Sequence, residues 1–192
     1  GEDEIPGKAA DGAKALIDEL HSALDPKAYR KAVALLAESE FIDIFGVENS
    51  LTPAMDLFTK LGYLGLTCRL NTDAYLQQIG AGHLPHGAVA VAFSHSGSSA
   101  DTVKALRLAK SHGAKTIAIT NAIGAPLASW ADVTLLTGRD SHTIYGNAVF
   151  SRVADTALVD MLYMGVILSD YGRFSTALDE SGRMIRDRVF EN

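Results

Sequence analysis

The sequence predicts an α/β fold: a three-layer, doubly wound sheet of five parallel strands, with extra helices at both ends of the chain. Short apolar segments alternate with helical segments along most of the 192 residues, a pattern typical of a parallel sheet with crossover helices. The central segment 88–93 is apolar on both faces, as buried parallel strands are. Apolar residues make up 47% and charged residues 21% of the chain, which fits a globular domain and excludes disorder.

Two helices are predicted before the first strand. Residues 1–7 are expected to be a loose end or a cloning remnant, followed by a single domain over residues 8–192. Residues 8–23 are rich in Ala and Leu and predict the first helix. Asp25 and Pro26 start the second helix, because Asp is a good N-cap and Pro fits the first helical position.

The remaining elements alternate. The strands are short apolar runs, the helices begin at pairs such as Thr52-Pro53, and Gly113 ends the amphipathic helix before it. In chain order, the prediction is a helix to residue 39, a strand at 41–47, a helix from 52 to 62 or 65, a strand at 66–70, a helix at 72–79, a strand at 88–93, a helix at 100–112, a strand at 115–120, a short helix at 126–130, a strand at 132–136, and helices at 147–169 and 174–190.

The helix predicted at 147–169 carries an apolar stripe that is wider than one core face needs. Packing in the core is one interpretation of this width, and burial in a subunit interface is the other. Met161 and Met164 lie at helical spacing and are assigned to the core. A homodimer or homotetramer is expected.

Charge and cysteine usage limit the location and the partners. The net charge is −6, and the bases near the N-terminus alternate with acids, so these residues should not bind nucleic acid by themselves. The single cysteine, Cys68, cannot form an internal disulfide and favours a cytoplasmic protein. Residues 74–100 lack charge but contain Gln, His and Pro, so no membrane span is predicted. No metal-site or nucleotide-binding motif is present, and no cofactor or metal is expected.

The clearest functional signal follows the third strand. The segment Ser94-His95-Ser96-Gly97-Ser98-Ser99 places four serines and one glycine between an apolar strand and a helix. Gly97 permits a tight turn, the helix adds free N–H groups at its positive end, and the hydroxyls add uncharged donors. One serine would be enough to cap the helix. The serine hydroxyls beyond the one needed for capping predict a phosphate or sulfate site. Ligand loops of such sheets meet beyond the carboxyl ends of the strands, which adds the loops at 46–50, 121–124 and 137–146.

The same residues resemble a known family. Residues 94–99 fit the S-x-S-G-x-[ST] motif of the SIS (sugar isomerase) domain, and agreement extends to 105–113, 116–121 and 126–132. Within that family, the helix around 151–163 and the two leading helices are most similar to the effector-binding half of RpiR-type bacterial transcription regulators. The resemblance covers about residues 30–170. It implies the SIS fold with a flavodoxin-like strand order, and dimers with the ligand close to the subunit boundary.

The resemblance also implies a ligand and its contacts. Three serines of the motif would hold the phosphate of a phosphosugar, with help from the first loop. The predicted ligand-binding set is Ser50, Ser94, His95, Ser96, Ser99, Glu48 and Asn121. The helix-turn-helix domain of RpiR-type regulators is absent from this sequence, so DNA would be bound only through a domain outside these residues.

Two departures from the family pattern help to decide whether the chain senses a phosphosugar or isomerises it. Glu48 stands where the first loop usually has its second glycine, and its carboxylate would either clash with a phosphate or accept sugar hydroxyls; we favour the sugar contact. Related isomerases have a Glu and a Lys where this chain has Ser98 and Asn49. No catalytic residue is therefore assigned, and the leading hypothesis is a phosphosugar sensor that is not an enzyme.

Two alternatives stay open. A phosphosugar aldose–ketose isomerase could act through His95 or Glu48, because moving a proton between adjacent carbons needs a base. The second alternative is a domain that binds a phosphate metabolite other than a sugar. Among the remaining candidates, His83 and His86 are expected at the surface, Asp101 is a first-turn acid favoured by the helix dipole, and His142 either faces the site or is solvated.

Overall fold

The strands form one parallel sheet in the computed structural model, which describes residues 1–139 and 152–186. The order is β2-β1-β3-β4-β5, so the predicted flavodoxin-like order is confirmed. Parallel pairing joins β1 to both β2 and β3, and β4 to both β3 and β5. The strands are β1 (Ile42–Phe45), β2 (Cys68–Leu70), β3 (Val89–Phe93), β4 (Lys115–Thr120) and β5 (Val133–Leu136).

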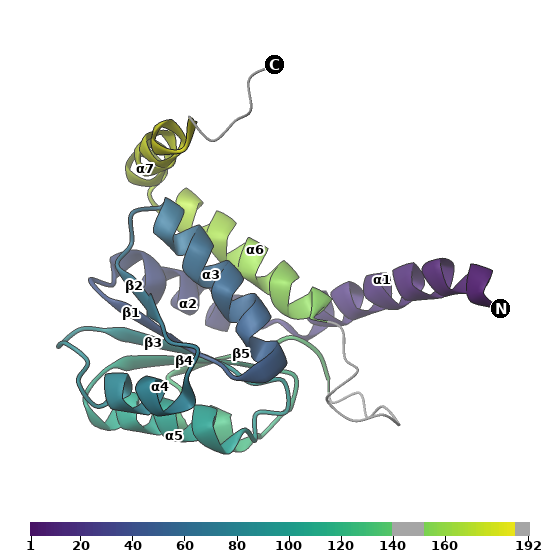
Figure 1. Cartoon of the computed structure of the whole chain (residues 1–192), viewed down its shortest axis with the longest axis horizontal. Coiled ribbons are helices and arrows are strands. Elements are labelled where there is room, and N and C mark those ends of the chain that lie inside the picture. Colours follow the sequence, from purple (N-terminus) through teal and green to yellow (C-terminus); the bar gives the residue numbers. More distant parts are fainter. Residues whose placement is uncertain (140–151, 187–192) are drawn as a thin grey trace.

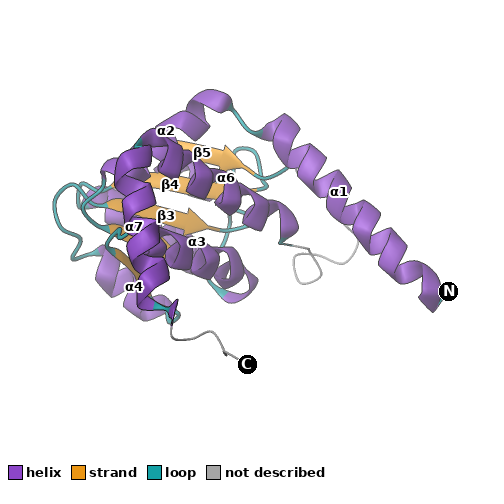
Figure 2. Ribbon diagram, turned by 90° about the horizontal axis from the view of Figure 1, so that it is seen from above, coloured by secondary structure: helices purple, strands orange, loops and turns teal. Residues whose placement is uncertain are grey.

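Helices cover both faces of the sheet, which gives the predicted three layers (Figures 1 and 2). One face is packed by α2 (Pro26–Glu38), α3 (Leu51–Tyr63), α6 (Val153–Ser169) and α7 (Tyr171–Met184). The other face is packed by α4 (Ala74–Ala81), α5 (Ala100–Ser111) and the short 3-10 helix η3 (Pro126–Trp130). The chain begins with a 3-10 turn, η1 (Glu2–Glu4), and α1 (Ile5–Ala23).

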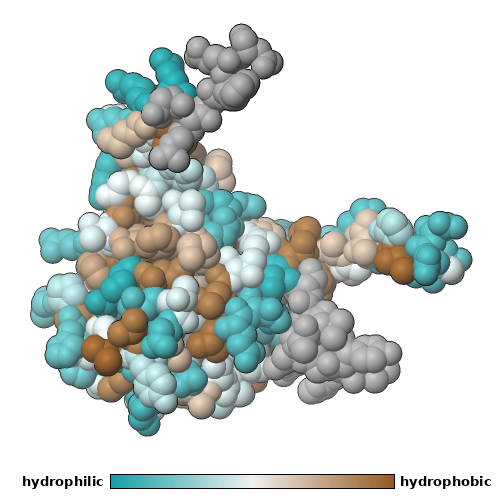
Figure 3. Space-filling model, viewed as in Figure 1, coloured by the Kyte–Doolittle hydropathy of each residue, from teal (hydrophilic) through white to brown (hydrophobic). Residues whose placement is uncertain are grey.

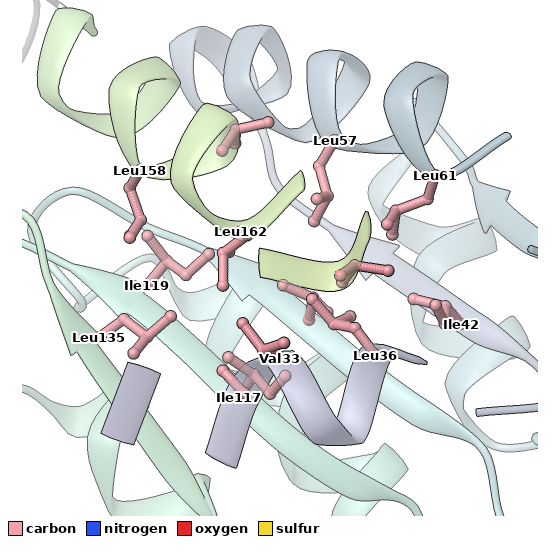
Figure 4. Packing of buried hydrophobic residues seen from close by; sticks show 14 of the residues in the cluster. Val33, Leu36, Ile42, Leu57, Leu61, Ile117, Ile119, Leu135, Leu158 and Leu162 are labelled. Atoms are coloured by element: carbon pink, nitrogen blue, oxygen red, sulfur yellow. The ribbon is translucent and has the colours of Figure 1, made fainter. Parts of the chain in front are cut away.

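The two faces of the sheet differ in side-chain size. The face toward α3 and α6 presents mainly Ile, Val and Leu, and Figure 4 shows Leu57, Leu61, Leu158 and Leu162 above Ile117 and Ile119. The face toward α5 is largely alanine: Ala88, Ala90, Ala92 and Ala118. Small side chains allow α5 to lie close to the sheet, and this places its first turn beside the end of β3.

Most predicted boundaries agree with the structure, and the differences have local causes. Residues 2–7 are helical in η1 and α1, so the expected loose end at residues 1–7 was wrong, and Pro6 fits the first turn of α1. Helix α7 begins at Tyr171, before the predicted residue 174, because the Asp170 side chain caps it by accepting from the Arg173 amide at 3.1 Å. The predicted start of the long helix at residue 147 lies outside the described residues.

Helix α6 has both a buried and an exposed apolar face. Leu158, Val159 and Leu162 are fully buried, whereas Met164 and Leu168 are 51% and 67% exposed. The assignment of Met164 to the core was therefore wrong. The core needs only one face of the helix, because α6 is an outer layer over the sheet.

A largely buried ion pair joins strand β1 to the edge strand β2. The Asp43 side chain is 1% exposed, and Arg69 of the edge strand β2 donates to both of its carboxylate oxygens, at 3.0 and 2.6 Å. Burial raises the pKa of Asp43, against the effect of the Arg69 charge. The pair ties β2 to β1, and β2 has no other strand neighbour within the described sheet.

A cavity at the reversal of strand order

The candidate site lies where the strand order reverses. Strands β1 and β3 are neighbours in the sheet, but their chain continues to opposite faces, so the loops that follow them separate and leave a crevice. A cavity of about 510 Å³ occupies this place. It is lined by Val47, Glu48, Asn49, Ser50, Ser94, His95, Ser96, Ser99, Asp101 and Arg152. Six of the seven residues predicted to bind ligand are therefore brought together.

The first wall of the cavity is the loop after β1. It forms a 3-10 turn, η2 (Glu48–Ser50), that leads directly into α3. Glu48 has φ of 51°, the left-handed conformation that glycine adopts most easily. This explains why the family pattern favours glycine at this position. A non-glycine residue held in this region costs on the order of 1–3 kcal/mol, and such strain gathers at functional sites.

The second wall is the serine loop, residues 94–99. Gly97 has φ of +61°, and a Cβ there would lie 2.3 Å from the Ala125 Cβ and 2.8 Å from the Thr120 hydroxyl oxygen. Only glycine fits this turn, which is closed by the Gly97 amide donating to the Ser94 carbonyl at 2.9 Å. The prediction of a tight glycine turn at this position is confirmed.

The serine loop presents donors rather than caps. Ser99 precedes α5, but no side-chain capping bond to the α5 amides is found among the described residues. Its hydroxyl instead accepts from Thr102 at 3.1 Å. The start of α5 therefore lies beside the cavity without a side-chain cap from Ser99, and the positive end of the helix dipole there suits an anion.

His95 and Asn121 form a second layer under the serine loop. The carbonyl of His95 accepts from the Asn121 amide at 2.9 Å and from the Thr120 hydroxyl at 3.0 Å. The Asn121 side-chain nitrogen lies 3.4 Å from His95 Nε2. Asn121 is not among the residues that line the cavity, and its side chain lies against His95, which does line it. The residue supports the loop because β4 ends directly beside β3.

Arg152 was missed by the sequence reasoning. It lies just before α6 and lines the cavity. Its Nε and Nη1 atoms are buried and have no hydrogen-bond partner within the described residues. Two features of the sequence could have indicated this residue. It follows the loop after the fifth strand, at the carboxyl edge of the sheet. It is also a cation at the start of a helix, where the helix dipole does not favour a positive charge.

Arg152 also affects a buried acid. Asp155 is 5% exposed, and burial raises its pKa, while the positive charge of Arg152 and a hydrogen bond from Thr137 act in the opposite direction. The same guanidinium thus acts electrostatically on a buried carboxylate and lines the cavity. An anionic ligand in the cavity would lie beside the positive charge of this guanidinium.

The other candidates lie elsewhere. His83 and His86 are exposed in the turn before β3 and do not line the cavity, as predicted. Asp101 lines the cavity and accepts from the Gln78 side chain at 3.1 Å. His142 lies outside the described residues. Within the described part of the chain, no group of three or more His, Cys, Asp or Glu residues is placed to hold a metal ion, and none of the described helices has the length and hydropathy to cross a membrane.

The sheet order and the hydroxyl-lined cavity at the reversal point define an α/β ligand-binding domain of the doubly wound class. A family model for the SIS domain matches residues 35–165. The chain belongs to the SIS domain family, as the serine motif indicated.

Relatives of known type are bacterial regulators. An uncharacterized HTH-type transcriptional regulator of Caldanaerobacter subterraneus is 30% identical over 185 residues, which are 96% of this chain and 66% of that protein. The HTH-type transcriptional regulator RpiR of Escherichia coli is 24% identical over 169 residues, 88% of this chain and 54% of that protein. This chain thus spans about half to two thirds of the length of these relatives.

A solved structure shares the fold over nearly the whole chain. The Vibrio vulnificus NanR protein, complexed with ManNAc-6P, superposes with a TM-score of 0.91 at 24% identity. The match covers 97% of this chain and 70% of that one. The fold agrees with the predicted SIS fold, extra terminal helices included.

Proposed function

We propose that this chain is the phosphosugar-binding sensor domain of an RpiR-type transcriptional regulator. The observation that carries the proposal is the cavity, where four serine side chains, the uncapped start of α5 and the Arg152 guanidinium come together; two nitrogens of that guanidinium have no hydrogen-bond partner within the described residues. Uncharged donors and one cation suit a phosphate dianion. The carboxylates of Glu48 and Asp101 line the same cavity and suit sugar hydroxyls. The likeness to NanR, whose structure contains ManNAc-6P, supports this ligand class.

A panel of ligands tests the proposal. Glucose 6-phosphate, fructose 6-phosphate and N-acetylmannosamine 6-phosphate are each compared with the unphosphorylated sugar by thermal shift. A ligand at 100 times its Kd stabilises the fold by about 2.7 kcal/mol. We expect at least one sugar phosphate to raise Tm and its unphosphorylated form not to. Equal shifts from the two forms would contradict the phosphate argument.

Replacing Ser96 with alanine should weaken the best sugar phosphate by about 1.5–3 kcal/mol, roughly 10- to 150-fold, because a hydrogen bond to a charged group is lost. Titration calorimetry measures the change. Ser98→Ala is the matched control, since Ser98 belongs to the same loop but does not line the cavity. A Ser96→Ala variant that binds as tightly as the parent would show that the site lies elsewhere.

Sensing without turnover is part of the proposal. The relatives named above are regulators, and the family's isomerase pattern is broken at Ser98 and Asn49. Solvent deuterium exchange at the carbon next to the sugar carbonyl detects proton abstraction even without net conversion. We expect none. Exchange that disappears in Glu48→Gln or His95→Ala would establish the isomerase instead.

Association into at least a dimer is proposed from exposed apolar residues on α6 and α1. Met164 and Leu168 face outward, and α1 projects from the body as an arm whose only buried side chain is Leu20 (Figure 1). Figure 3 shows this arm as largely hydrophilic, with apolar side chains interspersed. Exposed apolar side chains such as Met164 and Leu168 of α6 are typical of subunit contacts. DNA would be read by a part of the whole protein outside these residues.

Light scattering at micromolar concentration should therefore give at least twice the monomer mass. The double variant Met164→Glu, Leu168→Glu should shift the mass toward the monomer, because two carboxylates would be desolvated in the interface. Ile79→Glu is the control, since Ile79 is equally exposed but lies on α4, across the sheet. A monomeric parent refutes this part of the proposal.

A further inference from the structure

Helix α4 (Ala74–Ala81) lies between the two walls of the cavity without lining it. It packs on α5, beneath the sheet in Figure 1, and its residues contact β1. Its inward side carries two consecutive glutamines, Gln77 and Gln78, and each reaches a different wall. Neither residue belongs to the predicted ligand-binding set.

Gln77 holds the start of the first wall. Its side chain is buried, with the residue 1% exposed. Its Oε1 accepts from the Gly46 amide at 3.2 Å, and its Nε2 donates to the Gly46 carbonyl at 2.7 Å and to the Asn71 carbonyl at 2.7 Å. The side-chain amide thus replaces a strand neighbour where β1 has ended, and satisfies both backbone groups of Gly46.

Fixing Gly46 fixes the loop that follows it. A Cβ on Gly46 would lie 3.0 Å from the Ser50 carbonyl oxygen, so the loop folds back tightly against this residue. Between them lies Glu48 in its left-handed conformation, which needs surrounding contacts to persist. The position of Glu48 and Ser50 in the cavity therefore depends on the Gln77 contacts.

Gln78 reaches the second wall. Its Nε2 donates to Asp101 Oδ1 at 3.1 Å. Asp101 lies in the first turn of α5, two residues after Ser99, and lines the cavity. A single turn of α4 is therefore hydrogen-bonded to Gly46, at the start of the first loop, and to the first turn of α5, directly after the serine loop.

We propose that Gln77 and Gln78 are positioning residues that set the spacing of the two ligand loops, so that α4 acts as a clamp on the site. This inference rests on the proposed phosphosugar function. A sugar phosphate long enough to contact both loops depends on their spacing. Inorganic phosphate, held by the serine loop and the α5 amides, does not.

The test compares two kinds of probe on the Gln77→Met variant, which removes three hydrogen bonds at similar side-chain volume. The three sugar phosphates of the panel and inorganic phosphate are titrated by calorimetry. We expect the best sugar phosphate to bind about tenfold more weakly, the equivalent of roughly 1.4 kcal/mol, and phosphate to change less than twofold. Gln78→Met, at a partly exposed position, should act in the same direction, and Leu76→Met on the outer face of α4 is the matched control.

A double-variant cycle locates the effect. Gln77→Met combined with Ser50→Ala should cost less than the sum of the two single changes, because both act on the first loop, whereas combination with Ser96→Ala should be additive. Equal losses for sugar phosphate and inorganic phosphate would show a general structural role and overturn the clamp. If Gln77→Met does not fold, unchanged sugar phosphate affinity in Gln78→Met overturns it. If the parent protein binds no sugar phosphate, the proposed function is refuted together with the clamp. If the parent binds a sugar phosphate but the variants show no selective loss, only the clamp is refuted, so the two failures are distinguishable.

Discussion

Replacing Arg152 with methionine should weaken sugar phosphate binding by about 2–5 kcal/mol, or roughly 30- to 5,000-fold. The guanidinium has two buried nitrogens without a hydrogen-bond partner within the described residues, and it lines the cavity beside neutral serine hydroxyls. Removing it leaves a phosphate dianion with dipoles alone to balance its charge. Calorimetry with the best sugar phosphate of the panel measures the loss.

Two controls separate binding from folding. Arg152→Lys keeps the charge but not the planar fork, so it should recover part of the affinity. Arg152→Met also removes a positive charge near the buried Asp155, so its free energy of unfolding is measured beside that of Asp155→Asn. Parental affinity in Arg152→Met would mean that the ligand phosphate is held by the serine loop without the guanidinium.

Replacing Arg69 with methionine should lower the free energy of unfolding by about 3 kcal/mol, because a buried carboxylate loses its countercharge. The value is at the lower end of the usual range since the Arg69 side chain is 32% exposed and water partly screens the pair. Urea unfolding with an unchanged m-value measures the loss. Stability and not ligand affinity is the readout, because the Arg69 guanidinium also packs on Gly80 of α4, the helix that carries Gln77 and Gln78.

The pH dependence of this variant follows from the sign of the Asp43 shift. The pKa of Asp43 is raised in the folded state, so the folded protein binds the Asp43 proton more tightly than the unfolded chain does. The contribution of this proton to the free energy of unfolding is therefore lost as the pH rises through the folded pKa. Without Arg69 the pKa rises further. The deficit of Arg69→Met should therefore shrink as the pH falls from neutral through that pKa toward the ordinary carboxyl value.

The double variant Asp43→Leu, Arg69→Met is the matched control. Removing both charges leaves no buried ion, so most of the lost stability should return. If Arg69→Met alone is as stable as the parent, the pair does not hold the edge strand, and the contact of β2 with β1 must rest on packing and backbone hydrogen bonds.

Much of the fold and part of the candidate site could be predicted from the sequence, because the features that form them lie within short, contiguous segments. Short apolar runs and a helix cap such as Asp25 depend on neighbours a few positions away, and the structure confirms this cap. The serine loop was predictable for the same reason: its turn, its glycine and its hydroxyls are contiguous. The parallel order then placed the first loop opposite it, since only one reversal point exists in this sheet.

Tertiary structure alone decided which distant residues complete the site. Arg152 lines the cavity because α6 begins beside it, and Asn121 contacts His95 because β4 ends beside β3. Helix α4 reaches both sides of the cavity because Gln77 bonds Gly46 after β1 and Gln78 bonds Asp101 in the first turn of α5. Met164 lies outside the core for a similar reason, since only packing against the other helices selects the buried face of α6. Sequence periodicity records which residues can be buried or can donate a hydrogen bond. Which partner each residue finds depends on contacts between segments far apart in the chain, and these exist only once the layers have packed.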